Sequence, residues 1–363
     1  MNYEIVFDSE QNMKPLFIPI RIVNWKKLSS HADLVYLEQF TNQVDWNTAS
    51  RNPKAIPLIE QHLEIILNKL NWYWLSRNPN VCSMLNKPHV YSICKDQINW
   101  SSLCDLPNAT TFLEKHPDKI QWHWLCQNPY AVPFLEKHMD KIDWYYLSEN
   151  PNAMHLLVQH QDKLAWARMG QNPNALSLLE THLDEIDWEW VCINPNALPL
   201  LEKYPHKIVW ELASDNPHLL PLFEKNIEKV VWENVCRSQT NPDIISFLEK
   251  HVNKLSYLCW KILSADPNAI SLLKKYPEKI VWETLTLNSA AIPLLEKHPQ
   301  KIYWENLSAN PNAMHFLFRL DLLKMKQNNE AFKDELIAYV FDPDRMIRLS
   351  KGLDLRTYLI AYS

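Results

Sequence analysis

The sequence predicts an all-α solenoid of about thirteen two-helix repeats, each about 22 residues long, with a different segment capping each end. Three observations predict this fold. Thirteen of the sixteen tryptophans fall in one register, the dipeptide Asn-Pro recurs at a fixed distance from them, and only two glycines occur in 363 residues. So few glycines leave out most of the tight turns on which β architectures depend.

Tryptophan sets the repeat length. The interval is 22 residues six times in succession between Trp100 and Trp232, and 26 or 28 residues at the steps Trp46–Trp72, Trp72–Trp100 and Trp232–Trp260. The extra residues are predicted to be loop insertions, which cost little free energy at a surface. The tryptophans in register are Trp25, Trp46, Trp72, Trp100, Trp122, Trp144, Trp166, Trp188, Trp210, Trp232, Trp260, Trp282 and Trp304.

Each of these tryptophans lies in the first helix of a repeat, helix A, which we expect to be about two turns long. The third residue after tryptophan is always apolar and the fourth is always small, as in Leu147 and Ser148 after Trp144. Positions i, i+3 and i+4 share one face of a helix, so these residues predict a buried stripe. We expect the indole rings to stack as an interior spine and the small residues to let a neighbouring helix approach closely.

Asn-Pro separates helix A from a second helix, helix B. Asn is a favoured N-cap, and Pro is favoured at the first helical position. A second proline often follows four residues later, as Pro133 follows Pro129, where an established helix would lose a hydrogen bond. Asn-Pro-Asn-Ala is therefore predicted to form a separate tight or 3₁₀ turn, with helix B beginning after it. Prolines such as Pro117 and Pro205 are predicted to mark the end of helix B.

The two ends of the chain depart from the repeat. Residues 1–24 are expected to form an N-terminal cap, with a short extended segment in KPLFIPIRIV. Residues 25–318 form the predicted solenoid. Residues 319–363 have the pattern of two or three ordinary helices and are predicted to be a C-terminal helical cap or docking segment.

Composition favours an intracellular, cytoplasmic protein. The net charge of −5 and the pI near 6.3 give no bulk basicity to attract nucleic acid or an anionic membrane. Seven cysteines, an odd number with no Cys-x-x-Cys pair, suit a reducing compartment. No apolar run reaches the roughly 18 residues of a membrane span, and the N-terminus lacks a secretory signal.

The unit W-x-x-L-S-x-N-P-N-A-I-x-L-L-E-K-x-x-x-K-I resembles tandem-repeat proteins of giant nucleocytoplasmic DNA viruses, the mimivirus-like viruses of amoebae and algae. The resemblance covers about residues 25–318, and Phe341, Pro343 and Arg345 are similar to an F-x-P-x-R tail of such proteins. The order of Asn-Pro and then Pro is also similar to leucine-rich variant repeats, whose short helices alternate in a superhelix. The viral resemblance implies a host or viral partner and a place in the host cytoplasm, a viral factory or the virion.

Histidine and cysteine each recur at one equivalent position of successive repeats, which we call a column, and both columns favour a structural role. Neighbouring histidines would lie about one helix spacing, roughly 8–10 Å, apart, whereas the ligands of one zinc ion lie within about 2.3 Å of it. The cysteines share their position with serine, which indicates size and not reactivity. We therefore predict no catalytic residue, metal or cofactor. The histidines are His62, His116, His138, His160, His182, His251 and His298, and the cysteines are Cys104, Cys126, Cys192 and Cys236.

Charge also recurs in two columns. We predict solvated ridges that pair between repeats, and a lysine track for a phosphate backbone is the alternative. The glutamates are Glu114, Glu136, Glu180, Glu202, Glu224, Glu249 and Glu296, and the lysines are Lys119, Lys141, Lys163, Lys207, Lys229, Lys254, Lys279 and Lys301.

The residues one, two and five positions after each tryptophan face away from the buried stripe. In the first two-thirds of the array they are rich in aromatic rings with arginine nearby, the composition of interface hot spots. The alternative is that these rings pack on one another. The candidate partner-binding residues are Tyr73, Trp74, Arg77, His123, Trp124, Gln127, Tyr145, Tyr146, Arg168 and Trp190.

These observations favour a non-catalytic scaffold that binds a protein partner along the helix A face. RNA or single-stranded nucleic acid bound by helical repeats is an alternative, and a structural virion component is another. We expect no enzyme activity, no membrane association and no small-molecule substrate, because the columns assemble no cluster of acid, base and nucleophile.

Overall fold

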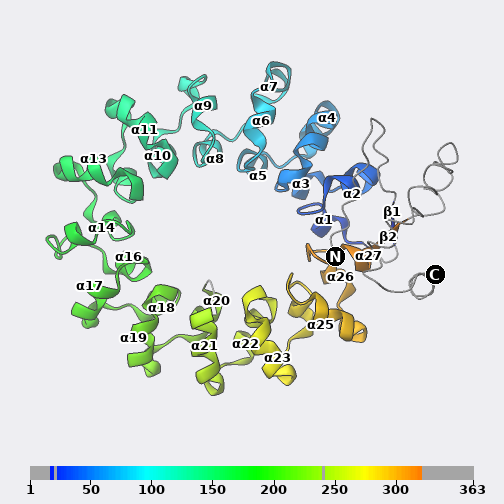
Figure 1. Ribbon diagram of the computed structural model, residues 1–363. Helices are drawn as coiled ribbons and strands as arrows, with labels where there is room; N and C mark the ends of the chain where they lie inside the picture. The colour runs from blue at the N-terminus through cyan, green and yellow to red at the C-terminus, as the bar shows by residue number, and fades with distance from the viewer. Residues whose placement is uncertain (1–16, 20–22, 239–241, 321–363) are drawn as a thin grey trace, which may run out of the picture. The chain divides into compact units, whose positions relative to one another are not determined.

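The computed structural model describes residues 17–19, 23–238 and 242–320, and it confirms the all-α repeat solenoid (Figure 1). The chain divides into two compact units. One unit comprises residues 21–317 and holds the repeats, and the other comprises residues 1–20 together with 318–363.

Helix A begins at the register tryptophan in twelve of the thirteen repeats, and in the eleventh it begins three residues earlier. Most of these helices have four to six residues, so they are shorter than the predicted two turns. Helices of this length are marginal alone and depend on packing between repeats. They are α1 (Trp25–Leu28), α3 (Trp46–Ala49), α5 (Trp72–Ser76), α8 (Trp100–Cys104), α10 (Trp122–Gln127), α12 (Trp144–Leu147), α14 (Trp166–Met169), α16 (Trp188–Ile193), α18 (Trp210–Ala213), α20 (Trp232–Arg237), α22 (Tyr257–Ala265), α24 (Trp282–Leu285) and α26 (Trp304–Leu307).

The residue before tryptophan caps many of these helices. The Oδ1 atom of Asn71 accepts a hydrogen bond from the Trp74 N–H at 3.1 Å, and Asp143 accepts one from the Tyr145 N–H at 3.2 Å. Such side-chain caps satisfy amides that have no partner within the helix.

The Asn-Pro-Asn-Ala phrase forms a 3₁₀ turn in several repeats, as predicted. In the fifth repeat the turn η5 spans Pro129–Ala131, and helix B begins at Val132. Pro133 is therefore the second residue of helix B, where its missing N–H costs no helical hydrogen bond. Helix B is α2 (Leu34–Gln39), α4 (Ile56–Ile66), α6 (Val81–Leu85), α9 (Thr110–Leu113), α11 (Val132–Leu135), α13 (Met154–Gln159), α15 (Leu176–Leu179), α17 (Leu198–Lys203), α19 (Leu220–Lys225), α21 (Pro242–Lys250), α23 (Ile270–Lys275), α25 (Ile292–Lys297) and α27 (Met314–Leu317).

The prolines predicted to end helix B begin a second 3₁₀ turn. This turn is η4 (Pro117–Lys119) in the fourth repeat and η9 (Pro205–Lys207) in the eighth. It leads into the next helix A, so one complete repeat is helix A, a turn, helix B and a turn.

Two of the three long intervals between tryptophans contain added helix, and their prediction as loop insertions was wrong. In the third, Trp232–Trp260, residues 239–241 lie outside the described residues. Between Trp72 and Trp100 the extra residues form a separate helix, α7 (Pro88–Cys94). Between Trp46 and Trp72 they extend α4 to eleven residues. The apolar residues Leu58, Leu63 and Ile66 recur along α4 at helical spacing and are buried, so the inserted turns are held by packing.

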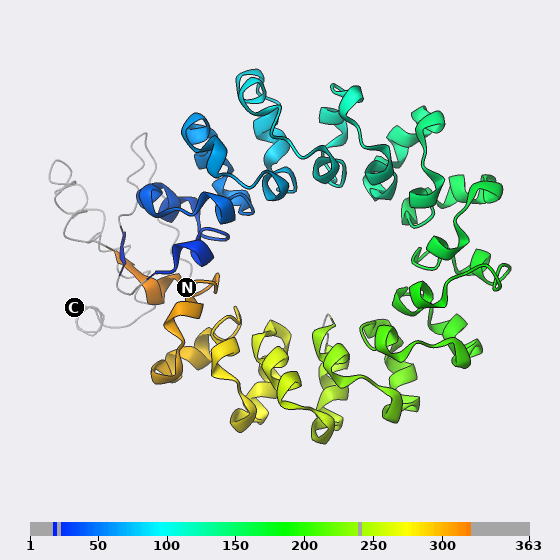
Figure 2. The same ribbon diagram turned by 180° about the vertical axis from the view of Figure 1, so that it is seen from behind.

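The core follows the predicted stripe. The third residue after every register tryptophan has no exposed surface, as do the alanine of the phrase and the last leucine of helix B in most repeats, for example Leu147, Ala153 and Leu157. Figures 1 and 2 show neighbouring helices A, such as α16 and α18, side by side along one edge of the array, with helices B such as α17 and α19 along the other.

The tryptophan rings do not form the predicted interior spine. Trp46 and Trp260 are buried, and the other register tryptophans are half-buried. Their rings pack on helix B of their own repeat, as the ring of Trp122 does on Phe134 at 5.9 Å and on His138 at 5.5 Å. The deepest layer is aliphatic, and the indoles cover it.

The second unit contains an antiparallel pair of short strands, β1 (Phe17–Pro19) and β2 (Phe318–Leu320). The extended segment predicted in KPLFIPIRIV is present as β1, and its partner is the segment that follows the last repeat. Phe318, predicted to end the solenoid, is the first residue of β2. The helices predicted in 319–363 lie outside the described residues, except that 319–320 belong to β2.

Candidate binding surface

The ten predicted binding residues lie on helix A or directly after it, on the side opposite the buried stripe. We call this side, formed by positions one, two and five after each register tryptophan, the helix A face. Tyr73, Trp124 and Tyr145 expose 46%, 39% and 51% of their surface. The other seven are half-buried, namely Trp74, Arg77, His123, Gln127, Tyr146, Arg168 and Trp190.

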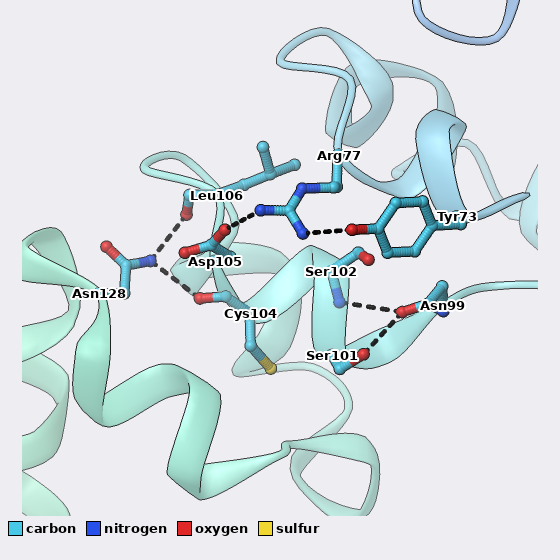
Figure 3. Close-up of polar contacts among 9 residues, drawn as sticks. All are labelled: Tyr73, Arg77, Asn99, Ser101, Ser102, Cys104, Asp105, Leu106 and Asn128. Atoms are coloured by element: carbon cyan, nitrogen blue, oxygen red, sulfur yellow. Dashed lines mark hydrogen bonds and ion pairs between the residues drawn. The ribbon is translucent and has the colours of Figure 1, made fainter. Parts of the chain in front are cut away.

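An N-terminal cluster gathers around Tyr73, Trp74 and Arg77. Arg77 donates a hydrogen bond to the Tyr73 hydroxyl at 3.0 Å and forms an ion pair with Asp105 at 2.7 Å (Figure 3). The guanidinium of Arg51, from the second repeat, lies 4.3 Å from the centre of the Trp74 ring. Three consecutive repeats therefore join through alternating aromatic and charged side chains.

A central cluster forms around Arg168. Its guanidinium lies 4.8 Å from the Tyr145 ring, 5.6 Å from Tyr146 and 5.7 Å from Trp190, and it pairs with Glu149 at 3.2 Å. The Nε atom of Arg168 is buried and has no hydrogen-bond partner among the described residues. A guanidinium held by three ring faces gains cation–π attraction in place of water.

His123, Trp124 and Gln127 link the fifth repeat to the central cluster. The His123 ring lies 5.6 Å from both Trp124 and Tyr146. Gln127 donates a hydrogen bond to the Glu149 carboxylate at 2.6 Å. The Glu149 carboxylate therefore accepts a hydrogen bond from the fifth repeat and forms an ion pair with the seventh.

The helix A face thus combines the two arrangements that the sequence allows. Tyr146, Arg168 and Trp190 pack mainly on one another, whereas Tyr73, Trp124 and Tyr145 keep exposed ring surface. Arg51 and Asp105 were not among the predicted residues. Both are five positions after a tryptophan, like Arg77, so the same column could have identified them.

The asparagine of Asn-Pro has a larger role than the predicted cap. In Asn128, Oδ1 accepts from the Tyr130 N–H at 3.0 Å. Its Nδ2 atom donates to the carbonyls of Cys104 at 2.9 Å and Leu106 at 3.0 Å (Figure 3). Asn150, Asn172, Asn194 and Asn216 each donate to the carbonyl of the asparagine one repeat earlier. These buried asparagines form a ladder of hydrogen bonds from repeat to repeat.

The small residue four positions after tryptophan is also a hydrogen-bond acceptor. Ser148 Oγ accepts the Ala165 N–H of the next repeat at 3.0 Å, and Cys126 Sγ accepts the Asp143 N–H at 3.3 Å. The prediction from size alone missed this bond. The signal was present, because the column contains Ser, Cys, Thr and one Gly but never Ala.

The charged ridges pair between repeats, but not with each other as predicted. Glu202 and Glu249 pair with Lys225 and Lys275 of the next repeat at 2.7 and 2.6 Å, and each of these lysines lies one position after the glutamate column. Most of the predicted lysine column lies instead over indole rings, as Lys301 does over Trp282 at 4.6 Å, or beside an aspartate, and Lys254 pairs with Glu228 of the preceding repeat at 3.3 Å. The exposed pairs each contribute little stability.

The histidine and cysteine columns are packed. His138, His160 and His182 contact the tryptophan ring of their own repeat. The cysteines are free and buried, and burial raises the pKa of the Cys104 and Cys126 thiols to about 11. Within the described residues, no three His, Cys, Asp or Glu side chains lie together so as to hold a metal ion.

Comparisons of the chain with protein-family models, with curated proteins and with solved structures found no match. In the described part of the chain, no helix is long and apolar enough to cross a membrane.

Proposed function

We propose that the chain is a non-catalytic repeat scaffold and that its helix A face binds a protein partner over the first eight repeats. The observation that carries this proposal is the exposed ring surface of Tyr73, Trp124 and Tyr145, aligned along one row of helices. Large aromatic rings that remain exposed on a rigid surface are typical of interface hot spots.

Charge indicates the chemistry of the partner. Lys26 and Arg51 are exposed on the same face, and neither forms an ion pair within the described structure. A partner segment with acidic and apolar side chains would complement both the cations and the rings. The resemblance to giant-virus repeat proteins adds that this partner is a host factor or another viral component.

The test compares two variants of the full chain. Changing Tyr73, Trp124 and Tyr145 together to Ala should weaken binding at least about tenfold while helicity and melting stay unchanged. The control is Tyr130→Ala, because Tyr130 is 64% exposed but lies in the turn η5, off the helix A face. Partners captured from cells by affinity purification are identified by mass spectrometry and then measured with purified chain.

Two outcomes would overturn the proposal. Loss of folding in the triple variant would show that the rings only pack. Retention of RNA by the purified chain, with elution that depends steeply on salt, would indicate nucleic-acid binding instead.

A further inference from the structure

The first repeat is hydrogen bonded to the last. The Asn24 N–H donates to Ser308 Oγ at 2.9 Å across 284 residues of sequence. Lys27 Nζ donates to Asn306 Oδ1 at 2.9 Å and to the Glu305 carbonyl at 3.5 Å. We call this contact of Asn24 and Lys27 with 305–308 the terminal junction.

The terminal junction has the geometry of a junction between consecutive repeats. The N–H of Asn24, the residue before Trp25, donates to Ser308, the small residue four positions after Trp304. Between two consecutive repeats, the N–H of Ala165, the residue before Trp166, donates to Ser148 in the same way at 3.0 Å. Lys27 is two positions after Trp25, and it donates to the carbonyl of Glu305, the residue after Trp304. In the same way, Asn234 is two positions after its tryptophan and donates at 2.7 Å to the carbonyl of Glu211, the residue after the tryptophan of the preceding repeat. The first repeat therefore follows the thirteenth as a next repeat would.

One part of the usual junction is missing. At the position of the ladder asparagine the first repeat has His31, whose Nε2 atom is buried without a hydrogen-bond partner among the described residues. Its Nδ1 atom faces the Ser30 hydroxyl at 3.3 Å. Asp33 replaces the second asparagine of the phrase and pairs with Lys54 of the second repeat.

In the fourth repeat, Leu106 also takes the place of the ladder asparagine, but Asn108 still donates to the Pro79 carbonyl at 2.9 Å. An interior junction with both asparagines is tied more firmly. Between the sixth and seventh repeats, Asn172 Nδ2 donates to the carbonyls of Ser148 and Asn150, and Asn174 donates to the Pro151 carbonyl. At the terminal junction, neither His31 nor Asp33 makes such a bond to the thirteenth repeat in the described structure. Asn172 is buried and its amide satisfies two backbone carbonyls, so these bonds stabilise the junction more than the exposed bond of Asn174 does.

The strand pair of the other unit supplies none of the missing asparagine bonds. β1 and β2 pair over three residues each, and a two-stranded ladder is marginal by itself.

We propose that the terminal junction is the point at which the repeat array opens, separating the first repeat from the thirteenth while the interior junctions stay intact. Opening exposes two complementary end surfaces, and closing restores the bond between Asn24 and Ser308. Local opening of the least stabilised unit below global unfolding is general in proteins. This inference does not depend on the proposed function.

The experiment is native-state hydrogen exchange of the full chain. The Asn24 amide should exchange at least about tenfold faster than the Ala165 amide, which has the same partner type in an interior junction. His31→Asn should slow exchange at Asn24 and leave Ala165 unchanged. The matched reverse variant, Asn172→His, should speed exchange at Ala165 and leave Asn24 unchanged.

Equal exchange at Asn24 and Ala165 in the unchanged chain would overturn the inference, as would a His31→Asn variant that folds but exchanges at Asn24 as before. A second measurement covers a variant that fails to fold. Ser308→Ala should lower the unfolding midpoint in urea less than Ser148→Ala, because a junction already open before unfolding contributes less to it. The opposite order would contradict the inference.

Discussion

The Nδ2 atom of Asn172 lies 3.0 Å from the backbone carbonyl oxygen of Asn150, the equivalent residue of the preceding repeat. The same amide donates to the Ser148 carbonyl at 3.1 Å, and Oδ1 accepts the Asn174 N–H at 3.0 Å. One fully buried side chain thus joins helix A of one repeat, the turn after it and the turn of the next repeat.

Replacing Asn172 by Ala should lower the free energy of unfolding by about 3 kcal/mol. The Ser148 carbonyl is left without a donor, which costs roughly 1–3 kcal/mol, and loss of the turn cap costs roughly 1 kcal/mol. The Asn150 carbonyl loses one of two bonds and keeps the Ala153 N–H at 3.2 Å. Urea denaturation measures the change. Asn174→Ala is the control, since that exposed side chain donates only to the Pro151 carbonyl, and it should cost less than about 1 kcal/mol. Equal losses would contradict the buried role of Asn172.

Ser148 tests the acceptor role of the small column. Its hydroxyl accepts the Ala165 N–H and donates to the Trp144 carbonyl at 2.7 Å. Ser148→Ala should cost about 1–2 kcal/mol in urea denaturation, because a buried amide loses its partner. Ser148→Cys should cost less, since Cys126 and Cys192 accept the equivalent amide at 3.3 Å. If Ala were tolerated better than Cys, size alone would explain the column.

Two ion pairs of different burial should respond differently to loss of charge. The Glu149 and Arg168 side chains are 13% and 18% exposed, whereas Glu202 and Lys225 are 40% and 65% exposed. Glu149→Gln should therefore cost about 1–3 kcal/mol and be insensitive to salt, because it leaves a mostly buried guanidinium without a counter-charge.

Glu202→Gln is the matched control and should change stability by less than about 1 kcal/mol. Both free energies come from urea denaturation at low and high salt. A larger effect at Glu202 than at Glu149 would show that burial does not govern these pairs.

The buried thiols predict sensitivity to alkaline pH. Burial raises the pKa of Cys126 from 9.0 to about 11, so the folded chain holds this proton more tightly than the unfolded chain. The stabilisation is complete below pH 9.0 and is lost as the pH rises toward about 11. The free energy of unfolding, measured from pH 8 to about 10.5, should fall less steeply in Cys126→Ser than in the unchanged chain. If the free energy of unfolding fell equally steeply with pH in both chains, the Cys126 thiol would not be a cause of the alkaline sensitivity.

Local chemistry made much of the fold predictable. The register of Trp144 and the phrase beginning at Asn150 set where each helix begins, and the structure follows both. The length of helix A was overestimated, although the reason is local. Asn128 precedes Pro129 and adopts an extended conformation, with φ −73° and ψ 113°, as residues before proline prefer. Helix A therefore ends by the fifth residue after tryptophan.

The binding surface was predictable only in part, because exposure depends on the neighbouring repeat. Tyr145 and Tyr146 are adjacent in sequence, yet Tyr145 is 51% exposed and Tyr146 is half-buried beside His123 and Arg168. Arg168 meets Glu149 at a separation of 19 residues, which is not a multiple of the repeat. Contacts of this kind join different positions of two neighbouring repeats and depend on how one repeat packs on the next. Comparing equivalent positions along the sequence does not reveal them.

The bond between Asn24 and Ser308 makes the order of the repeats cyclic. Thirteen repeats are then joined by thirteen junctions, and the covalent start of the chain lies at one of the junctions that lack the ladder asparagine. A circular permutant that begins at the seventh repeat, with Leu320 joined to its strand partner Phe17 by a short linker, would keep every pair of neighbouring repeats. Evolution could therefore move the termini of such a chain, or insert whole repeats, without inventing a new kind of contact.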